Sequence, residues 1–121
     1  MIVNKIEWMS KEAQEAILYI GDGEYECAAF SHPCDLEEEY VLVEPLLAFS
    51  VEGLMIAEGS NLSISRKGES LAHDVVGKLL SVDPLIIKVG SFKIELEDPL
   101  PGGVMDDSVV QFSCGRLDVI R

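Results

Sequence analysis

The sequence predicts an all-β fold, a small closed or partly open β-barrel with at most one short helix. Short segments that alternate hydrophobic and polar residues recur along the chain, and Gly, Pro and Asp turns separate them roughly every eight to twelve residues. Hydrophobic residues make up 48% of the chain and aromatic residues 7%, so the core is mainly aliphatic. A chain of 121 residues is long enough for one core. We therefore expect a single β-barrel domain over residues 1–121.

The first elements predict a β-hairpin. A short apolar segment, IEWM, comes near the start, and the segment EAILYI ends at Gly21-Asp22-Gly23. These turn residues readily adopt the positive φ angles of a tight turn. In the following segment, EYECAAF, Tyr25, Cys27 and Ala29 share one face, which is the period of a half-buried strand. The pattern predicts a hairpin from Gln14 to Phe30.

The middle of the chain predicts further short strands. Residues 40–59, YVLVEPLLAFSVEGLMIAEG, are rich in aliphatic residues but are interrupted by Pro45 and Gly53. Proline and glycine suit an edge, a bulge or a corner better than a central strand, so we expect two or three short strands here. The segment NLSISRKG alternates again and predicts another strand.

The one helical expectation lies in residues 68–80, GESLAHDVVGKLL, where Ser70 is a possible N-cap. Val75, Val76 and Gly77 weaken that helix, so a single turn is expected. Next, LIIKV and FKIEL flank Gly90-Ser91, which predicts a tight hairpin. The last segment, SVVQFSCGRLDVI, predicts a closing strand with a bulge at Gly115.

This order of elements, taken over nearly the whole chain, resembles an OB-fold-like small β-barrel. The resemblance lies in the placement of turns and implies a fold without implying a site. The segments AFSHPC and FSCGRLDVI also resemble an uncharacterised bacterial protein family of unknown function.

Net charge is the strongest global feature of the sequence, at −13 with a pI near 4.3. Residues 1–58 hold two bases and thirteen acids, which gives −11, and residues 59–121 hold seven bases and nine acids, which gives −2. Because nucleic acids and anionic lipids are bound mainly through Lys and Arg, we expect neither as a partner.

A protein partner fits the charge better, and this partner is possibly a second copy of the chain. The segment Gly59–Lys93 carries five bases and three acids, a net charge of +2. It is able to neutralise the acidic half within the fold or across a symmetric homodimer.

The sequence also predicts a cytoplasmic protein. Its longest apolar runs fall short of the roughly 18 residues that a membrane-spanning helix needs. Asn4, Lys5 and Glu7 interrupt the apolar segment that a signal peptide would require. The three cysteines are an odd number at irregular spacing, which fits reduced thiols better than a disulfide framework.

The segment FSHPCDLEEEY, residues 30–40, holds the main candidate site. Its carboxylates are Asp35, Glu37, Glu38 and Glu39. Consecutive acids spread around the backbone and do not converge on one cation, so they form either a solvated loop or a docking surface for a partner. We expect this acidic loop to be the partner-binding surface.

The alternative is a small zinc or thiol-redox site built on Cys27, His32 and Cys34, because thiolates and imidazole are preferred zinc ligands. Cys114, His73 or Asp35 would supply a fourth ligand. Strand alternation places Cys27 on the opposite face from His32 and Cys34 unless Pro33 redirects the backbone.

The individual cysteines predict little reactivity. Cys27 and Cys114 lie on apolar strand faces, where an unpaired cysteine behaves as a small hydrophobic residue. Cys34 is expected to be an exposed thiol, and the nearby carboxylates disfavour its thiolate form.

Motifs for catalysis are not evident. No serine lies in a Gly-x-Ser-x-Gly turn, and the glycine-rich turns lack the lysine of a phosphate-binding loop. His73-Asp74 reads as an ordinary surface pair, and Trp8 is expected to pack in the core or at the end of the barrel. We therefore expect a non-enzymatic protein–protein interaction module without a cofactor.

Overall fold

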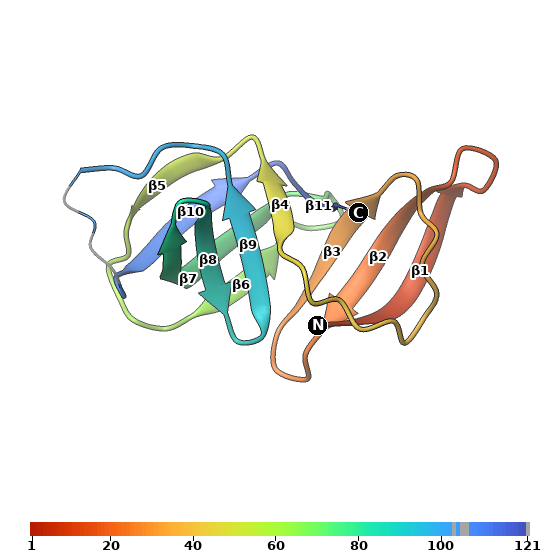
Figure 1. Ribbon diagram of the computed structural model, residues 1–121, viewed down its shortest axis with the longest axis horizontal. Coiled ribbons are helices and arrows are strands. Elements are labelled where there is room, and N and C mark those ends of the chain that lie inside the picture. The colour runs from red at the N-terminus through yellow and green to blue at the C-terminus, as the bar shows by residue number, and fades with distance from the viewer. Residues whose placement is uncertain (103, 105–106, 121) are drawn as a thin grey trace.

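The computed structural model is an all-β protein, and it describes residues 1–102, 104 and 107–120 (Figure 1). Residues 103, 105, 106 and 121 of the predicted single domain lie outside this description. The described strands are β1 (Ile2–Ser10), β2 (Glu15–Gly21), β3 (Glu26–Ser31), β4 (Leu46–Phe49), β5 (Glu52–Ile56), β6 (Ser63–Arg66), β7 (His73–Val82), β8 (Leu85–Val89), β9 (Phe92–Leu96), β10 (Val109–Cys114) and β11 (Arg116–Val119). In the part of the chain described here, no helix is long and apolar enough to cross a membrane.

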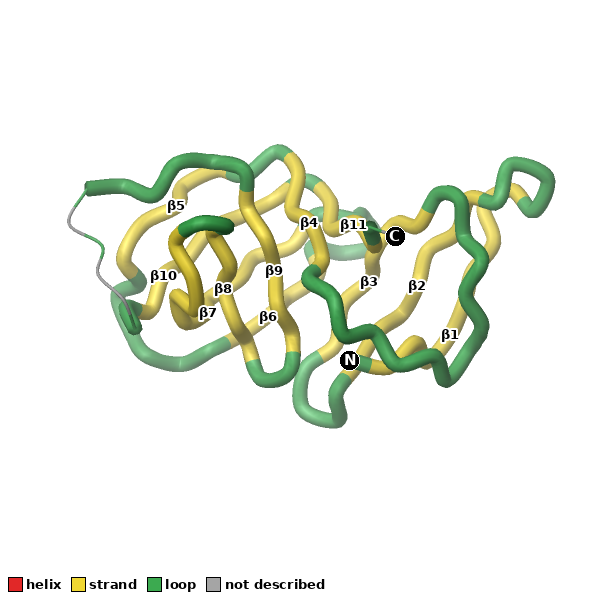
Figure 2. Tube along the Cα trace, in the orientation of Figure 1, coloured by secondary structure: helices red, strands yellow, loops and turns green. Residues whose placement is uncertain are grey.

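The strands form one sheet in the order β1-β2-β3-β11-β4-β9-β8-β7-β10-β5, with β6 paired to β7 (Figure 2). Two neighbouring pairs, β3–β11 and β4–β9, are parallel, and the others are antiparallel. The predicted all-β class is therefore confirmed. The described pairings leave β1 and β5 at opposite ends of the order, so they do not close the sheet into a barrel.

Both predicted hairpins are confirmed. Strands β2 and β3 pair antiparallel, with Leu18 opposite Ala29, and β8 and β9 pair antiparallel around a turn at Gly90, whose φ is +58°. The carboxylate of Asp22 joins the two turns: its Oδ1 accepts backbone N–H groups of the β2–β3 turn, and its Oδ2 accepts the N–H of Ser91 at 2.9 Å.

The helical interpretation of residues 68–80 is wrong, although an all-β fold without a helix stays within the predicted class. Residues 73–82 form strand β7, and its burial alternates along the strand, with His73, Val75 and Gly77 buried and Asp74 and Lys78 exposed. Ser70 does not cap a helix but closes a turn before the strand, because its hydroxyl donates to the carbonyl of Lys67 at 2.6 Å. The β-branched residues that weakened the helical pattern favour the strand.

The closing segment is two strands instead of one bulged strand. Strand β10 pairs with β7 and β5, and after Gly115 strand β11 pairs with β4 and β3. The N–H of Gly115 donates to the carbonyl of Phe49 at 2.9 Å, and a Cβ on Gly115 would lie 3.1 Å from that of Ser50. This close approach explains a glycine where the chain changes partners.

The core is one aliphatic cluster that includes residues from both ends of the sheet. Over one face of β1–β2–β3 runs the connection between β3 and β4, residues 32–45 (Figure 2). Cys34, Leu36 and Leu42 of this connection are buried in the cluster. Side-chain packing therefore holds this connection against the sheet, although it has little regular secondary structure.

Candidate functional site

The acidic loop, residues 35–39, is exposed at its charged positions and anchored at its apolar one. Its exposed carboxylates are Asp35, Glu37, Glu38 and Glu39. Leu36 lies among them with 6% of its surface exposed, packed into the core cluster. The predicted exposed acidic loop is confirmed, and its carboxylates stay hydrated while its backbone is held in place.

Backbone hydrogen bonds fix both ends of this loop. The N–H of Cys34 donates to the carbonyl of Gln14 at 2.7 Å, and the N–H of Glu39 donates to the carbonyl of Val3 at the same distance. Val3 in turn donates its N–H to the carbonyl of Tyr40 at 3.0 Å. These hydrogen bonds therefore hold the loop in one defined position against the neighbouring backbone.

Exposed apolar side chains follow directly after the acidic loop. Val41 is 56% exposed, Val43 is 74% exposed, and Ile120 from the end of the described chain is 48% exposed. We call Val41, Val43 and Ile120 the apolar patch. Val43 and Ile120 line a hollow of about 80 Å³ between residues 40–46 and residues 119–120. Apolar side chains exposed beside a charged loop are typical of an interaction surface.

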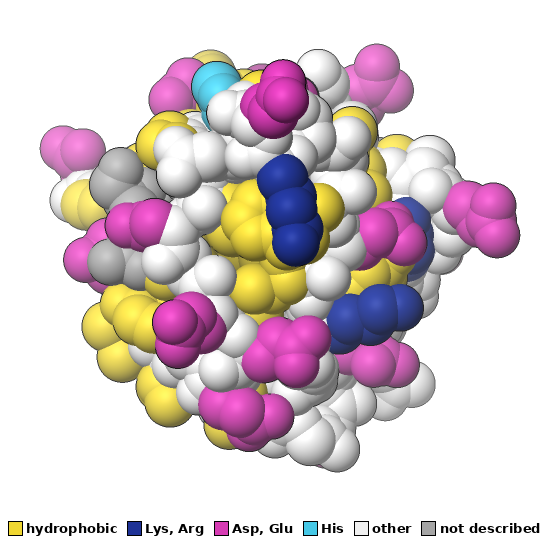
Figure 3. Space-filling view, turned by 90° about the vertical axis from the view of Figure 1, so that its right-hand side faces the viewer, with side chains coloured by type: hydrophobic (Ala, Val, Ile, Leu, Met, Phe, Trp, Pro, Cys, Tyr) yellow, Lys and Arg dark blue, Asp and Glu magenta, His cyan; other side chains and the backbone are white. Residues whose placement is uncertain are grey.

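The β1 end of the molecule carries a second exposed apolar area, which acidic side chains surround (Figure 3). Trp8 and Met9 of β1 are exposed, and the Nζ of Lys11 lies 6.0 Å from the centre of the Trp8 ring. Trp8 is 38% exposed on the end strand of the sheet, so the core position expected for it is wrong, while its packing at an end of the fold stays a prediction.

The cysteines are all buried. Cys27 and Cys114 belong to the core cluster as predicted, and burial raises the pKa of both thiols. Cys34 is 2% exposed, so the predicted exposed thiol is wrong: Pro33 is exposed, but the next residue packs its side chain into the core cluster. Cys27 and Cys114 are therefore poor nucleophiles, because burial disfavours their thiolate forms.

The structure does not bring Cys27, His32 and Cys34 together as ligands. His32 is exposed and lies beside Phe30, with 6.4 Å between the ring centroids, whereas both cysteines are buried. Within residues 1–102, 104 and 107–120, no group of three or more His, Cys, Asp or Glu side chains is placed to hold a metal ion.

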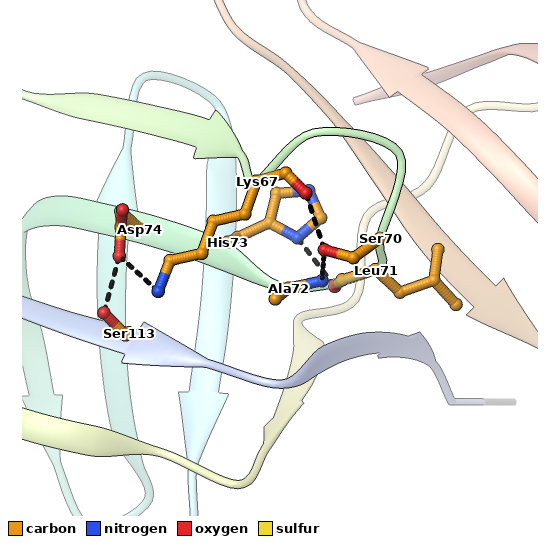
Figure 4. Close-up of polar contacts among 7 residues, drawn as sticks. All are labelled: Lys67, Ser70, Leu71, Ala72, His73, Asp74 and Ser113. Carbon is orange, nitrogen blue, oxygen red and sulfur yellow. Dashed lines mark hydrogen bonds and ion pairs between the residues drawn. The ribbon is translucent and has the colours of Figure 1, made fainter.

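His73 is a buried polar residue that the sequence reading missed. Its Nε2 accepts the backbone N–H of Ala28 at 3.2 Å. Its Nδ1 lies 3.0 Å from the carbonyl of Leu71 (Figure 4). These partners require a neutral ring with the proton on Nδ1. Burial lowers the pKa of His73, which agrees with that neutral form. The sequence did contain a hint of this burial, because His73 occupies one of the inward-facing positions in the alternating pattern of β7.

Asp74 points the other way along the same strand, toward the surface (Figure 4). Its Oδ1 accepts the hydroxyl of Ser113 at 2.5 Å and lies 3.2 Å from the Nζ of Lys67. The hydrogen bond from Ser113 is the largest cause that lowers the pKa of Asp74. His73 bonds to backbone on the opposite face, so His73, Asp74 and Ser113 do not form a hydrolytic triad.

Arg116 is stacked and paired on the outer face of β11. Its guanidinium carbon lies 4.6 Å from the centre of the Phe30 ring and 5.4 Å from that of Phe49. Its Nε and Nη2 donate to the two carboxylate oxygens of Asp118 at 2.6 and 2.9 Å. The Nε and Nη2 of Arg116 and both carboxylate oxygens of Asp118 are thus used within the fold, and Asp118 is 8% exposed. The sequence could have predicted this pair, because residues two apart on a strand lie on the same face.

A larger hollow, of about 340 Å³, lies between β2–β3 and β6 and is lined partly by Tyr19, Ile64 and Arg66. The guanidinium of Arg66 is tied down, because it donates to the carbonyls of Ser70 and Glu69 at 2.7 and 2.9 Å. The hollow therefore offers a half-buried ring, which Lys5 and Arg66 already approach to 5.6 Å, and a guanidinium that is already hydrogen-bonded.

Comparisons with known proteins do not supply a function. No protein-family model, curated protein or solved structure matches this chain. Among the described residues, the acidic loop and the apolar patch are the strongest candidate site.

Proposed function

We propose that this protein is a non-enzymatic protein-binding module whose contact surface is the acidic loop together with the apolar patch. The partner is a basic protein segment that carries apolar side chains. The observation that carries the proposal is the fixed presentation of exposed carboxylates at residues 35–39 directly beside Val41 and Val43.

The two parts of the surface have different physical roles. Clustered carboxylates on a chain of net charge −13 attract a basic partner and raise its association rate. The apolar patch supplies the dehydrated contact that slows dissociation. A partner that carries both positive and apolar side chains gains from both, whereas nucleic acids and anionic lipids are repelled.

Two finer features belong to the same proposal. We propose that the part of the sheet from β4 to β10 is a partly open OB-like barrel, since β7 pairs with β6, β8 and β10 and so bends through a corner. We also propose that the protein acts in the cytoplasm, which the three unpaired buried cysteines support.

The test uses a synthetic peptide of alternating lysine and leucine as the basic apolar probe, with a glutamate-for-lysine peptide as its counterpart. We expect the lysine peptide to shift the amide resonances of residues 35–43 and 120, and the glutamate peptide to leave them unchanged. Val43→Asp should weaken the complex mainly through a faster dissociation rate. Replacing Glu37, Glu38 and Glu39 with Gln should slow association and reduce its salt dependence.

The matched control removes the same charge elsewhere, with Glu12, Glu24 and Glu58 replaced by Gln; all three are exposed and lie outside the proposed surface. Equal weakening by the two triple variants would show that only net charge attracts the peptide, and the proposal would fail. Shifts confined to other strands would also contradict it.

The alternative function, a zinc or thiol-redox site on Cys27, His32 and Cys34, has no specific observation in its favour. Elemental analysis of protein purified without a chelator separates the two. Zinc far below one equivalent agrees with the binding module, whereas stoichiometric zinc that is lost on Cys34→Ser would establish the alternative.

A further inference from the structure

We propose that β1 is a self-recognition strand, which pairs antiparallel with β1 of a second copy of this chain. Ile6 faces Ile6 of the second copy across a two-fold axis, and Lys5 faces Glu7 of the second copy. This inference uses the sheet edge and does not use the acidic loop, so it stands or falls separately from the proposed function.

The outer edge of β1 is open over most of its length. Strand β1 is the last in the pairing order and lies at the outer end of the molecule (Figure 1). Residues 39–42 cover its first residues, where Val3 uses both its N–H and its carbonyl and Ile2 forms an isolated bridge with Val41. From Asn4 to Ser10, no described strand pairs with β1 on that side. An uncovered edge of this kind is a template for another strand.

The charges on β1 select one partner and one register. Lys5 and Glu7 are exposed and flank Ile6 by one residue on each side. When two copies pair antiparallel about Ile6, each Lys5 lies directly opposite a Glu7, at the roughly 5 Å spacing of cross-strand neighbours. Parallel in-register pairing would oppose like charges, which is unfavourable. The pattern is thus complementary to itself in a single arrangement.

Both charged side chains are already held over the same face of the sheet. The hydroxyl of Tyr19 donates to Glu7 at 3.3 Å, and the Nζ of Lys5 lies 5.6 Å from the centre of the Tyr19 ring. A single lysine on an edge strand would repel its own copy and protect the edge. The lysine and glutamate together give attraction at two symmetric positions instead.

The opposite end of the sheet lacks this complementarity. Strand β5, residues 52–56, carries Glu52 and no base, so it offers no opposite charge for a second β5 or a closed two-fold pair. Pairing through β1 alone consumes the edge of each copy and gives a dimer that does not extend into a fibre.

Long-range repulsion opposes this dimer, since each copy carries −13. At physiological ionic strength, charges farther apart than roughly 8 Å are largely screened, whereas the cross-strand pairs at roughly 5 Å are screened less. The local pairs therefore decide the register when salt is present.

The experiment measures self-association by sedimentation velocity of the whole protein at physiological salt, up to its solubility limit. We expect the parent protein to dimerise, and Lys5→Glu and Glu7→Lys each to weaken the dimer by roughly tenfold or more, because two attractive pairs become repulsive. Mixing the two variants should restore a heterodimer, and the double variant K5E/E7K should restore the homodimer.

Matched controls are Lys11→Glu and Glu12→Lys, which change the charge equally in the exposed turn after β1 and outside the paired register. Both should dimerise like the parent protein. A parent protein that stays monomeric, a dimer unaffected by Lys5→Glu, or a loss that mixing does not rescue would each overturn the inference. So would a dimer that is lost only when Glu37, Glu38 and Glu39 become Gln, because the contact would then lie at the acidic loop.

Discussion

His73 joins strand β3 to strand β7 through a ring that has to stay neutral. Its two nitrogens bond to the N–H of Ala28 and the carbonyl of Leu71, and its exposed fraction is 0%. Protonating Nε2 would turn the acceptor into a second donor facing the Ala28 N–H. A buried imidazole in this arrangement makes the stability of the fold sensitive to pH.

The expected pH dependence follows from the sign of the shift. Burial lowers the pKa of His73 in the folded state from 6.5, so the unfolded chain binds a proton first as the pH falls. The contribution of His73 is complete above pH 6.5 and decreases as the pH falls toward the folded pKa. Its slope approaches about 1.4 kcal/mol per pH unit for one proton. Asp22 and Asp74, whose pKa values are lowered from 3.8, act in a more acidic range.

Urea unfolding between neutral pH and about pH 5 checks this prediction. His73→Ala should cost about 2–4 kcal/mol at neutral pH, because it leaves a cavity and an unpaired N–H, and it should flatten the pH dependence. His32→Gln, which removes the exposed histidine, is the matched control and should keep the slope of the parent protein. If the free energy of unfolding of His73→Ala kept the same pH dependence, that dependence would come from other groups.

At this scale, the sequence predicted residue types better than partners. It placed Cys27 and Cys114 in the core and the four carboxylates of residues 35–39 in solvent, because strand alternation and charge are local properties. It misjudged Cys34 and His73. The burial of Cys34 depends on a loop folding back over β1–β2–β3, and the role of His73 depends on Ala28, a residue 45 positions away in the chain.

Strand β7 is the element on which the sheet turns. Its first half pairs with β6 and its second half with β8, while β10 runs along its other side. Gly77 lies between the two halves, where a Cβ would approach the side chains of Ile87 and Val89 to 2.5 and 2.8 Å. The glycine is therefore required by close packing against β8 and not by an unusual φ angle.

Gly77→Ala is expected to destabilise the fold by about 1–3 kcal/mol, since the added methyl group overpacks a site between branched side chains. Gly59→Ala is the matched control, because nothing lies within 4 Å of a Cβ at that position. That control should change stability by less than about 0.5 kcal/mol. Thermal or urea unfolding measures both variants. Equal stability of the two would mean that β7 and β8 separate easily at this point.

The elements show where local patterns suffice and where they fail. The two hairpins were predictable because Gly21-Asp22-Gly23 and Gly90-Ser91 specify tight turns. The β7 segment was misread as helical because Ser70 resembles an N-cap, although the alternation from residue 73 onward was present in the sequence. Where a helical and a strand pattern compete over a short segment, the neighbouring strands β6, β8 and β10 decide.

The carboxylate of Asp22 links the two hairpin turns, and this contact between distant segments could not be predicted from local patterns. Burial acts to raise the pKa of Asp22, but hydrogen bonds from the N–H groups of Ser91, Tyr25 and Glu24 outweigh it and lower the pKa. The sequence marks Asp22 as a turn residue, and only the fold shows that it also holds the turn at residues 90–91.

At the scale of the whole molecule, the sheet order was beyond sequence reasoning. The parallel pairs β3–β11 and β4–β9 join segments that are far apart in the chain, and no turn specifies them. These pairs connect the β1–β2–β3 end to the rest of the sheet and let one aliphatic core continue through both. Composition predicted that core, but it did not predict the open order that leaves β1 as an edge.

Net charge acts on the whole fold. Of the ion pairs among the described residues, Lys67–Asp74 and Lys78–Asp107 are exposed and contribute little. The third, Arg116–Asp118, is partly buried, but it is a single pair set against a large excess of acids. Self-repulsion from a net charge of −13 is therefore the larger electrostatic effect, and salt should relieve it. We expect the melting temperature to rise between low and physiological NaCl, by roughly 4 °C for each kcal/mol of relieved repulsion.

The measurement is thermal unfolding at a fixed low protein concentration, because self-association would also stabilise the fold. Chloride is preferred to sulfate, which stabilises proteins by exclusion from their surface. The variant with Glu37, Glu38 and Glu39 replaced by Gln carries less repulsion, so its melting temperature should respond less to salt. A melting temperature that falls with NaCl would show that attractive ion pairs outweigh the repulsion, and the acidic surface would then be compensated within the fold itself.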